Sequence, residues 1–281
     1  MKMAVIGCGL IGGSMALSWK RAGIVDEVIA FGHNPATLQK ALDKGAADTV
    51  TTSMEEAVKD ADIVVSAVPV EAMESVFTEM APFLKSDAVV TDVGSTRQTV
   101  IAAARKGLGD KFHQYAPAHP IAGGEMPGVD YASADLFDEK VVISTPDEGM
   151  DPKVVTFIEE AWRKAGARVQ AMSPLQHDLT FASVSHLPHV LAYALVDMIA
   201  REENAQEKLK MAGAGFRDFT RIASSSPVMW RDICLSNREA LSHELKRYRA
   251  SLDTLQKYID ESDGKALESV FENAVRNRRG L

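Results

Sequence analysis

Cysteine is scarce in this chain: only Cys8 and Cys234 occur among 281 residues, and they lie far apart. So few cysteines cannot form a disulfide framework, and we therefore expect a reducing, cytoplasmic setting. Long apolar runs are lacking as well, because no stretch of about eighteen apolar residues occurs, which predicts no transmembrane helix. The first expected strand begins almost at the N-terminus, which leaves no room for a signal peptide.

Basic residues are also in short supply. The chain has 31 Lys and Arg against 39 Asp and Glu, a formal net charge of −8. This balance predicts no nucleic acid and no membrane as partners. The hydrophobic share of 46% and the charged share of 25% are typical of a globular enzyme. A chain of this length has room for two domains and a sizeable core.

A glycine-rich turn is the most informative feature that is present. The sequence GCGLIG occupies Gly7–Gly12 and directly follows the apolar run Met3–Ile6. A buried strand, a glycine turn and a helix form the arrangement that cradles a dinucleotide pyrophosphate at the helix N-terminus. One glycine permits the tight turn, the next admits the phosphates and the third lets helix and strand pack closely. The residues expected to contact the cofactor here are Gly7, Gly9, Leu10, Ile11 and Gly12.

The first half of the chain alternates between expected strands and helices. The strands are short and mostly apolar, as in a sheet covered on both faces. They are Met3–Ile6, Glu27–Phe31, Asp62–Ala67, Ala88–Asp92, Gln114–Ala116, Val141–Ser144 and Arg168–Ala171. The helices between them are Ile11–Ala22, Pro35–Lys44, Ala72–Leu84, Thr96–Leu108 and Pro152–Ala165. This alternation predicts an α/β fold with a doubly wound parallel sheet of Rossmann type.

Ligands of such sheets bind at the carboxyl ends of the strands. The segments that follow the expected strands are Gly7–Gly12, Gly32–Asn34, Val68 and Pro69, Gly94–Arg97, and the glycine-rich loop Ala118–Glu125. We expect the cofactor to be bound there, by His33, Asn34, Val68, Pro69 and Ser95 in addition to the glycine turn.

The second half of the chain is expected to be all helical. Ser173 and Pro174 form a good helix start, and the apolar helix that follows could extend to about Ala200. Further on, six apolar residues form one helical stripe, with spacings of about 3 to 4. They are Leu241, Leu245, Tyr248, Leu252, Leu255 and Ile259. The stripe is either an intramolecular core or a dimer interface, and we favour a homodimer. We therefore expect a dinucleotide-binding domain at 1–171 and a helical substrate-binding and dimerisation domain at 172–281.

Three polar residues stand out at the predicted ligand edge. His119 is an acid–base candidate because imidazole titrates near neutral pH, although a single loop histidine is more often a surface or structural residue. Ser95 precedes an expected helix and could simply cap it. Glu125, in the same loop as His119, could be a solvated charge.

The helical half carries a second polar group. His186 and His189 are three residues apart on one face of an apolar helix, and either are core histidines or line a site. No further ligands are arranged around them, so no metal is expected. Arg221 and Trp230, in a Gly- and Ser-rich context, suggest recognition of a carboxylate, and the alternative is an ion pair between Arg221 and Asp218.

In their order, these motifs resemble the prephenate/arogenate dehydrogenases of tyrosine biosynthesis. They are GCGLIGGS, TDVGSTR, HPIAGGE, SHLPH and GFRDFTRIASSSP, followed by Trp230. The resemblance covers nearly the whole chain and is specific as a set. It implies a Rossmann domain, a helical dimerisation domain and an NAD(P)-dependent oxidative decarboxylation that aromatises a cyclohexadienol.

The resemblance also implies roles for single residues. His119 corresponds to the histidine that accepts the proton of the ring hydroxyl, and Ser95 to the serine that orients both. Arg221 corresponds to the arginine that binds the ring carboxylate. The remaining matches are pocket residues: His189, Trp230, Asp218 reaching across the dimer, and Glu125 gating the pocket against the arginine.

The end of the second strand bears on the choice of cofactor. Gly32 stands where NAD-dependent relatives usually carry an acidic residue, and His33 and Asn34 could contact a 2′-phosphate. We therefore expect NADP to be preferred, with NAD possible. The choice between prephenate and arogenate stays open. Alternatives are another oxidoreductase with a Rossmann and a helical domain, of the β-hydroxyacid dehydrogenase or pyrroline-carboxylate reductase type, or a non-catalytic dinucleotide-sensing regulator.

Overall fold

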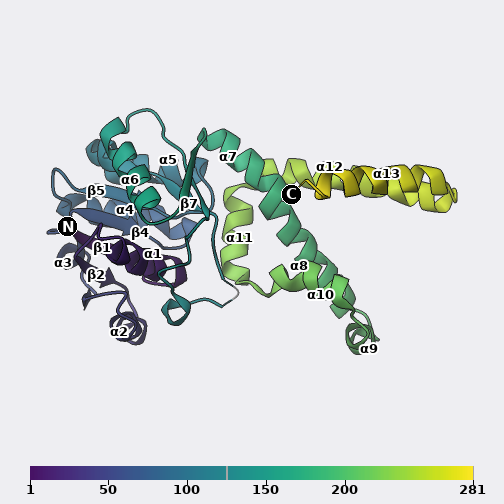
Figure 1. Ribbon diagram of the computed structural model, residues 1–281, viewed down its shortest axis with the longest axis horizontal. Helices are drawn as coiled ribbons and strands as arrows, with labels where there is room; N and C mark the ends of the chain where they lie inside the picture. The colour runs from purple at the N-terminus through teal and green to yellow at the C-terminus, as the bar shows by residue number, and fades with distance from the viewer. Residues whose placement is uncertain (125, 281) are drawn as a thin grey trace. The chain divides into compact units, whose positions relative to one another are not determined.

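The computed structural model describes residues 1–124 and 126–280. These residues divide into two compact units, 1–237 and 238–281. The first unit contains all the strands found in the described chain and the helices α1–α11, and the second consists of two helices (Figure 1).

A parallel six-stranded sheet forms the centre of the first unit. Its strands are β1 (Lys2–Ile6), β2 (Glu27–Phe31), β3 (Thr49–Thr51), β4 (Ile63–Ser66), β5 (Val89–Asp92) and β6 (Tyr115–Ala116). Their order is β3-β2-β1-β4-β5-β6, and every neighbouring pair is parallel. The order reverses at β1, so the predicted doubly wound sheet is confirmed and its switch point lies next to the glycine turn.

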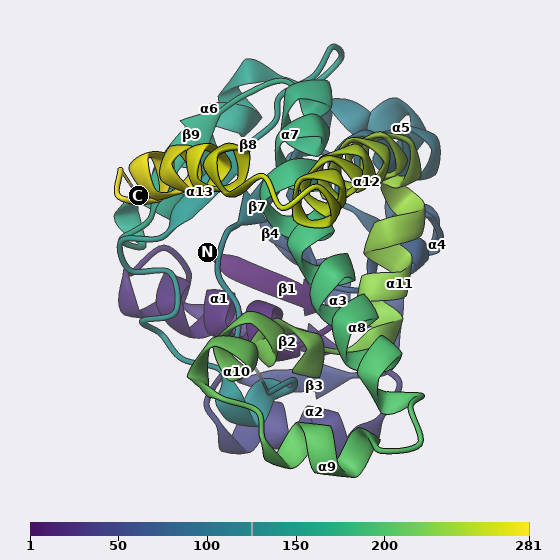
Figure 2. The ribbon, with the colours of Figure 1, turned by 90° about the vertical axis from the view of Figure 1, so that its right-hand side faces the viewer.

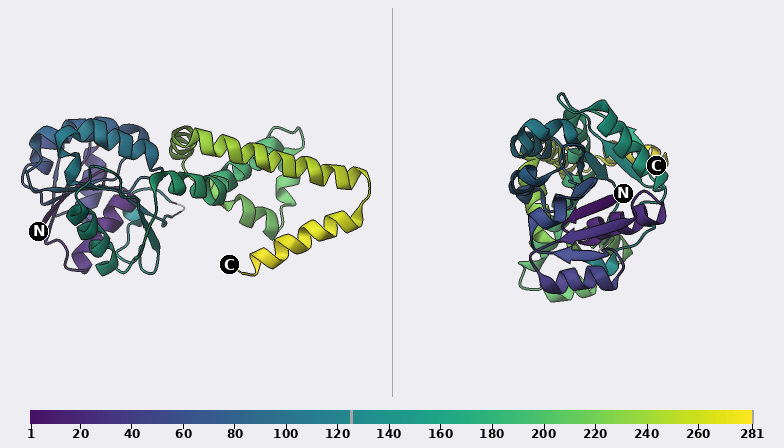
Figure 3. Two further views of the ribbon diagram at one scale, coloured as in Figure 1. Left: turned by 90° about the horizontal axis from the view of Figure 1, so that it is seen from above. Right: turned by 90° about the vertical axis from the view of Figure 1, so that its left-hand side faces the viewer.

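Helices cover both faces of this sheet. They are α1 (Leu10–Arg21), α2 (Pro35–Asp43), α3 (Met54–Val58), α4 (Met73–Met80), α5 (Gln98–Leu108) and α6 (Pro152–Lys164). The left view of Figure 3 shows α4 and α5 on one side and α1 and α6 on the other. On the latter side Trp19 of α1 meets Trp162 of α6 edge to face, with ring centroids 5.6 Å apart. Both rings are buried, so this contact joins the first and last helices of the layer.

Two short strands and one short helix were not predicted. Strand β3 (Thr49–Thr51) and helix α3 (Met54–Val58) are three and five residues long, too short for a periodic pattern to register. The third is β7 (Ala118–Pro120), which pairs antiparallel with β8 (Val141–Ser144). Strand β8 in turn pairs with β9 (Arg168–Ala171) in a separate three-stranded sheet.

This second sheet corrects two expectations. Strands β8 and β9 do not extend the parallel sheet, and His119 lies on strand β7 rather than in a loop. The backbone of His119 is in register with Ile143 of β8. Pro120 lacks an N–H and two glycines follow at 123 and 124, so the segment looked like a loop in the sequence.

From Ser173 onward the described residues are helical or irregular, as expected. The helices of the first unit here are α7 (Pro174–Phe181), α8 (Leu187–Ala200), α9 (Ala205–Lys210), α10 (Ala214–Thr220) and α11 (Pro227–Ser236). The Ser173 side chain caps α7 by accepting from the backbone N–H of Gln176. A π-helical turn, Ala182–His186, joins α7 to α8, and Figure 2 shows α8 and α11 side by side.

The continuous helix Pro174–Ala200 matches the apolar helix that the sequence predicts from Ser173 to about Ala200. It spans 27 residues, has a mean hydropathy of 1.4 in its most apolar window and is 22% buried there. By length and composition it could cross a membrane, and the expectation of no transmembrane helix stays a prediction. One such helix is weak evidence for a span. Three polar side chains of this helix, His177, Asp178 and His186, are buried within the chain.

The second unit is a helical hairpin of α12 (Arg238–Asp260) and α13 (Gly264–Arg278). The turn between them places Ser262 at φ +54°, and Asp263 caps α13 by accepting from the N–H of Ala266. The predicted apolar stripe lies on α12, where Leu252 and Ile259 are 46% and 59% exposed. A stripe with such exposed members has apolar surface left to bury.

Candidate active site

The glycine turn after β1 has the geometry that each glycine was expected to provide. Gly7 has φ +93°, and a Cβ on it would lie 2.8 Å from the carbonyl oxygen of Ala67. A Cβ on Gly12 would lie 2.5 Å from the carbonyl oxygen of Gly7. A Cβ on Gly9, in contrast, would meet nothing within 4 Å. Two glycines are therefore needed for packing within the protein, and the middle one faces open space.

That open space lies at the start of helix α1. Gly9 is the N-cap residue, no side chain caps the helix and its first turn carries no acidic residue. The N–H groups of the first turn, which begins with Leu10 and Ile11, therefore have no acceptor side chain of their own. Val68, just after β4, packs against the turn, because its Cγ1 is 3.1 Å from the ideal Cβ position of Gly7. Pro69 follows it and is exposed.

The end of β2 presents short polar groups. Gly32 is half-buried, and a Cβ there would lie 3.3 Å from a methyl group of Leu38. The Asn34 side chain caps α2, since its oxygen accepts from the N–H groups of Ala36 and Thr37. His33 is exposed and packs edge to face on Phe31, with centroids 5.2 Å apart. The side-chain oxygen of Asn34 is thus engaged in the cap, while its amide nitrogen and His33 remain at the surface.

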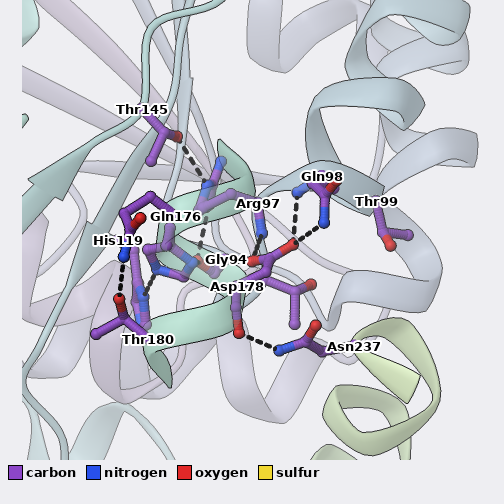
Figure 4. Close-up of polar contacts among 12 residues, drawn as sticks. Gly94, Arg97, Gln98, Thr99, His119, Thr145, Gln176, Asp178, Thr180 and Asn237 are labelled. Carbon is purple, nitrogen blue, oxygen red and sulfur yellow. Dashed lines mark hydrogen bonds and ion pairs between the residues drawn. The ribbon is translucent and has the colours of Figure 1, made fainter. Parts of the chain in front are cut away.

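A chain of hydrogen bonds leads to His119 from the interior. Nδ1 of His119 is 2.7 Å from Nε2 of His177, and Nδ1 of His177 is 2.9 Å from Oδ1 of Asp178. Asp178 lies at the N-terminus of α5, where its carboxylate accepts from the backbone N–H groups of Arg97 (2.7 Å) and Gln98 (3.0 Å). Figure 4 shows these groups around Asp178. The chain joins β7, α7 and the start of α5.

The pattern of donors fixes the ring protons along this chain. Three hydrogen bonds from N–H groups hold the pKa of Asp178 below its usual value, although burial alone would raise it. An ionised Asp178 accepts, so His177 donates from Nδ1 and offers the lone pair of Nε2. His119 must then donate from Nδ1, which leaves the lone pair on its own Nε2.

The same surroundings keep His119 neutral. Burial, then the charges of His177 and Arg97, lower its pKa well below the ordinary value for histidine. Burial likewise lowers the pKa of His177. An imidazole that is neutral at physiological pH and has a lone pair on Nε2 is a base ready to accept a proton.

Ser95 lies in the turn between β5 and α5, close to this chain in sequence. It is half-buried. Nearby, the Arg97 guanidinium donates to the carbonyl oxygen of Gly94, and the Arg97 backbone N–H donates to Asp178. The side chain of Ser95 makes no hydrogen bond with any residue that the structure describes. Its predicted contact with His119 stays a prediction.

A second cluster brings together three of the residues predicted to bind substrate. The ring of His189 stacks on Trp230, with centroids 3.6 Å apart and planes 20° apart. Burial lowers the pKa of His189, and the nearby positive charge of Arg221 lowers it further. Trp230 is buried, and its Nε1 donates to no described group. His186 links this cluster to the first, since its ring centroid lies 6.1 Å from Trp230 and its charge affects the pKa of His119.

The other two predicted substrate residues are Asp218 and Glu125. Asp218 is exposed on α10, the helix that directly precedes the turn with Arg221. Glu125 lies outside the described residues. No group of three or more potential metal ligands comes together in the parts of the chain that are described.

His177 and Asp178 were missed in the sequence. They form a His–Asp pair on an otherwise apolar helix, directly after its N-terminal turn, and both are almost fully buried. A charged residue inside an apolar helix is a signal that it is paired in the fold. The spacing to His119, 58 residues away, carried no such signal.

Family models match nearly the whole chain. The nucleotide-binding domain of prephenate dehydrogenase matches residues 15–171, and the dimerization domain of prephenate dehydrogenase matches residues 173–273. A cyclohexadienyl dehydrogenase of Zymomonas mobilis is 36% identical over 281 residues, which is 99% of this chain and 95% of that protein.

Solved structures agree with this match. The prephenate dehydrogenase from A. aeolicus in complex with hydroxyphenyl propionate and NAD+ is 34% identical with a TM-score of 0.91, over 99% of this chain and 98% of that one. The Synechocystis arogenate dehydrogenase is 27% identical with a TM-score of 0.82, over 99% of both chains.

Proposed function

Because the chain belongs to the prephenate dehydrogenase family, we propose that it oxidises and decarboxylates prephenate or arogenate with His119 as the base. The observation that carries this assignment is the hydrogen-bonded chain from Asp178 through His177 to His119. It supports a neutral imidazole whose free lone pair can take the proton of a ring hydroxyl.

The nucleotide half supports binding of a nicotinamide dinucleotide. The open space at Gly9, the uncapped N-terminus of α1 and the close packing at Gly7 and Gly12 fit a pyrophosphate. In our proposal Gly7, Gly9, Leu10, Ile11 and Gly12 hold that group, and Val68, Pro69 and Ser95 line the path toward the nicotinamide. The bound nicotinamide supplies the hydride acceptor of the reaction.

The side chains of the protein have two tasks in this reaction: they remove one proton and bind one carboxylate. As His119 removes the proton from the C4 hydroxyl, the electrons of that O–H bond help to expel hydride from C4. The charge that develops on His119 is stabilised by His177, which in turn is held by Asp178. Loss of CO₂ from C1 then gives an aromatic ring, which makes the step strongly downhill.

The second cluster is assigned to substrate recognition. Arg221 holds the carboxylate that is later lost, because a guanidinium can bind a carboxylate with two parallel hydrogen bonds. His189 and Trp230 form one wall of the pocket, and Ser95 orients the hydroxyl toward His119. Asp218 reaches into the site of a partner subunit, and Glu125 gates the pocket against Arg221.

We further propose NADP as the preferred cofactor. Gly32 leaves no carboxylate at the end of β2 to repel a 2′-phosphate, and His33 and the amide nitrogen of Asn34 lie at the surface there. The domain boundary at 171/172 is proposed on the limits of the two family models.

The proposed assembly is a homodimer in the cytoplasm, without nucleic acid or membrane as partner. The exposed apolar surfaces of Pro174–Ala200 and of α12 are the faces we assign to the dimer interface. Light scattering at micromolar protein concentration tests it, and the mass of a single chain would contradict it.

A steady-state comparison of both substrates with both cofactors tests the reaction. We expect turnover of at least one of prephenate and arogenate, with kcat/KM higher for NADP than for NAD. Cofactor binding without turnover of either substrate would overturn the assignment in favour of a non-catalytic dinucleotide sensor.

A further inference from the structure

Arg97 is a fully buried arginine that contacts the backbone next to the proposed base, His119. The side chains of Arg97 and Asp92 are both 0% exposed and pair through two hydrogen bonds of 2.8 Å. Tyr115 donates to Asp92 at 2.6 Å and lies 3.2 Å from the Arg97 guanidinium. Thr145 accepts from Nε of Arg97 at 3.2 Å. Every nitrogen of the guanidinium therefore has a partner.

Three further contacts of Arg97 end next to residues of the proposed site. Its guanidinium donates to the carbonyl oxygen of Gly94 at 2.7 Å and to that of Ala118 at 3.4 Å. Its backbone N–H donates to Asp178 at 2.7 Å. Gly94 precedes Ser95, and Ala118 precedes His119. One residue thus touches the backbone or side chain of all three elements that carry the base and its partners (Figure 4).

We propose that Arg97 is a positioning residue for the reaction: its buried guanidinium holds the turn at Ser95 and strand β7 at His119 in one fixed arrangement, while its backbone N–H holds Asp178. This inference rests on the proposed role of His119 as the base. The function of Asp92, Tyr115 and Thr145 is then to hold the guanidinium in place.

The chemistry of a buried ion pair supports a role beyond stability. Removing two charges from water costs several kcal/mol per ion, and well-packed apolar residues of similar volume are often as stable. A planar group with five donors in fixed directions offers something that apolar residues lack, because it can orient several carbonyl oxygens at once. Here two of those carbonyls belong to the backbone next to Ser95 and His119.

Arg97 also contributes to the charge environment of His119. Burial lowers the pKa of His119 most, and the charges of His177, Arg97 and His186 lower it further. The charges of Asp178 and Asp92 act in the opposite direction on the pKa of His177. A guanidinium that moves away from His119 therefore leaves a more basic imidazole. Displacement of Arg97 has a signature in the pH profile that a simple loss of stability does not have.

Two conservative variants and a matched control test the inference. Thr145→Val and Tyr115→Phe each remove hydrogen bonds from the Arg97 group without a large change in volume. Thr91→Val is the control, because Thr91 is equally buried and donates to the carbonyl oxygen of Ala116, and among the described residues it makes no hydrogen bond with Arg97. Arg97→Lys is the stronger perturbation, because it keeps the positive charge but loses the planar set of donors that the guanidinium provides.

For each variant we would measure kcat, the dissociation constant of the cofactor, the melting temperature and the pH profile of kcat/KM. Thr145→Val and Tyr115→Phe are expected to lower kcat by about tenfold, because the Arg97 guanidinium loses one hydrogen-bond partner in each. Cofactor affinity should not change. The acid limb of the pH profile of kcat/KM should move to higher pH, because His119 becomes more basic. Thr91→Val should keep kcat within about twofold of the wild type and leave the limb unmoved.

The outcomes separate this inference from the proposed function. If Thr145→Val and Tyr115→Phe match Thr91→Val in kcat and in the acid limb while His119→Asn is inactive, Arg97 is purely structural and the inference is wrong. If His119→Asn keeps its turnover, the proposed function itself is wrong. If Arg97→Lys fails to fold, the other two variants still decide.

Discussion

Two polar regions of the first unit differ in how complete they are within one chain. Around His119, the buried side chains of Asp92, Arg97, His177 and Asp178 all have hydrogen-bond partners, and Arg97 and His177 are shielded from water. Around Arg221, the residues proposed to bind substrate lie on short helical segments, α10 and the 3₁₀ turn Arg221–Ser224, and both Arg221 and Asp218 are exposed. We call the region around His119 the finished region, because its buried polar groups are paired within one chain. We call the region around Arg221 the open region, because Arg221 and Asp218 are exposed.

This difference indicates a division of labour. A base needs a fixed position and a controlled protonation state, which a dry and fully paired environment provides. Recognition of a charged substrate needs an accessible cation that can be covered later. The open region is the one in which we propose that a partner subunit and the substrate complete the site.

The largest effect is expected at the finished region. His119→Asn should lower kcat by about 10²–10⁴-fold, the range for loss of a general base, because Asn can still donate to His177 but cannot accept the proton. Cofactor affinity, measured by fluorescence titration, should change little. A variant that turns over at a near-normal rate would remove His119 from the mechanism.

At the open region the effect should appear in binding. Arg221→Ala is expected to weaken substrate binding by about 2–4 kcal/mol, mainly as a higher KM, since a substrate carboxylate loses its partner. Arg221→Lys should also weaken binding, because an ammonium cannot form the paired contact. An unchanged KM of Arg221→Ala for both prephenate and arogenate would show that the role is wrongly assigned.

Acid should destabilise the finished region. Burial lowers the pKa of His186 to about 4, so the unfolded chain binds a proton more readily than the folded one. Stability from the neutral ring is fully present above about pH 6.5 and is lost as the pH falls toward 4, to the extent of about 3 kcal/mol. Melting temperatures across this window should fall less for His186→Gln, and equal slopes for variant and wild type would contradict the assignment.

The same contrast between closed and open positions recurs within the glycine turn. Gly12→Ala should lower the free energy of unfolding by about 1–3 kcal/mol through overpacking against the Gly7 carbonyl. Gly9 itself has ordinary backbone angles, φ −93° and ψ −152°, and a Cβ there would enter open space. The Gly9→Ala variant should therefore fold normally but bind the cofactor more weakly, because the added methyl group occupies the space proposed for the phosphates. Thermal melts and cofactor titrations of the pair check this, and equal melting temperatures would refute it.

The smallest effect concerns the choice of cofactor. Gly32→Asp should raise the ratio of kcat/KM for NAD over NADP by about tenfold, or roughly 1.4 kcal/mol, because a carboxylate repels a 2′-phosphate. The substitution meets only the flexible Leu38 side chain. If the ratio stays the same, the end of β2 does not select the cofactor.

The sequence predicts what is local and periodic. The glycine turn, the five long helices of the nucleotide half and most strands were identified because each leaves a pattern in neighbouring residues. Strand β7 escaped because its pairing partner, β8, lies more than twenty residues away and its own three residues end in proline. The association of His119 with His177 and Asp178 escaped for the same reason: contacts between distant segments leave no spacing to read.

The carboxylate of Asp178 limits how freely the two halves of the chain can be exchanged between related enzymes. Helix α5 belongs to the nucleotide-binding half, yet no side chain of its own caps its N-terminus. It takes its acceptor from α7, about 80 residues further along. A segment that ends at Ala171 lacks this acceptor, so the limit between the two family models is not a limit between interchangeable modules. A recombinant enzyme that exchanges one half must bring a carboxylate to this position together with it.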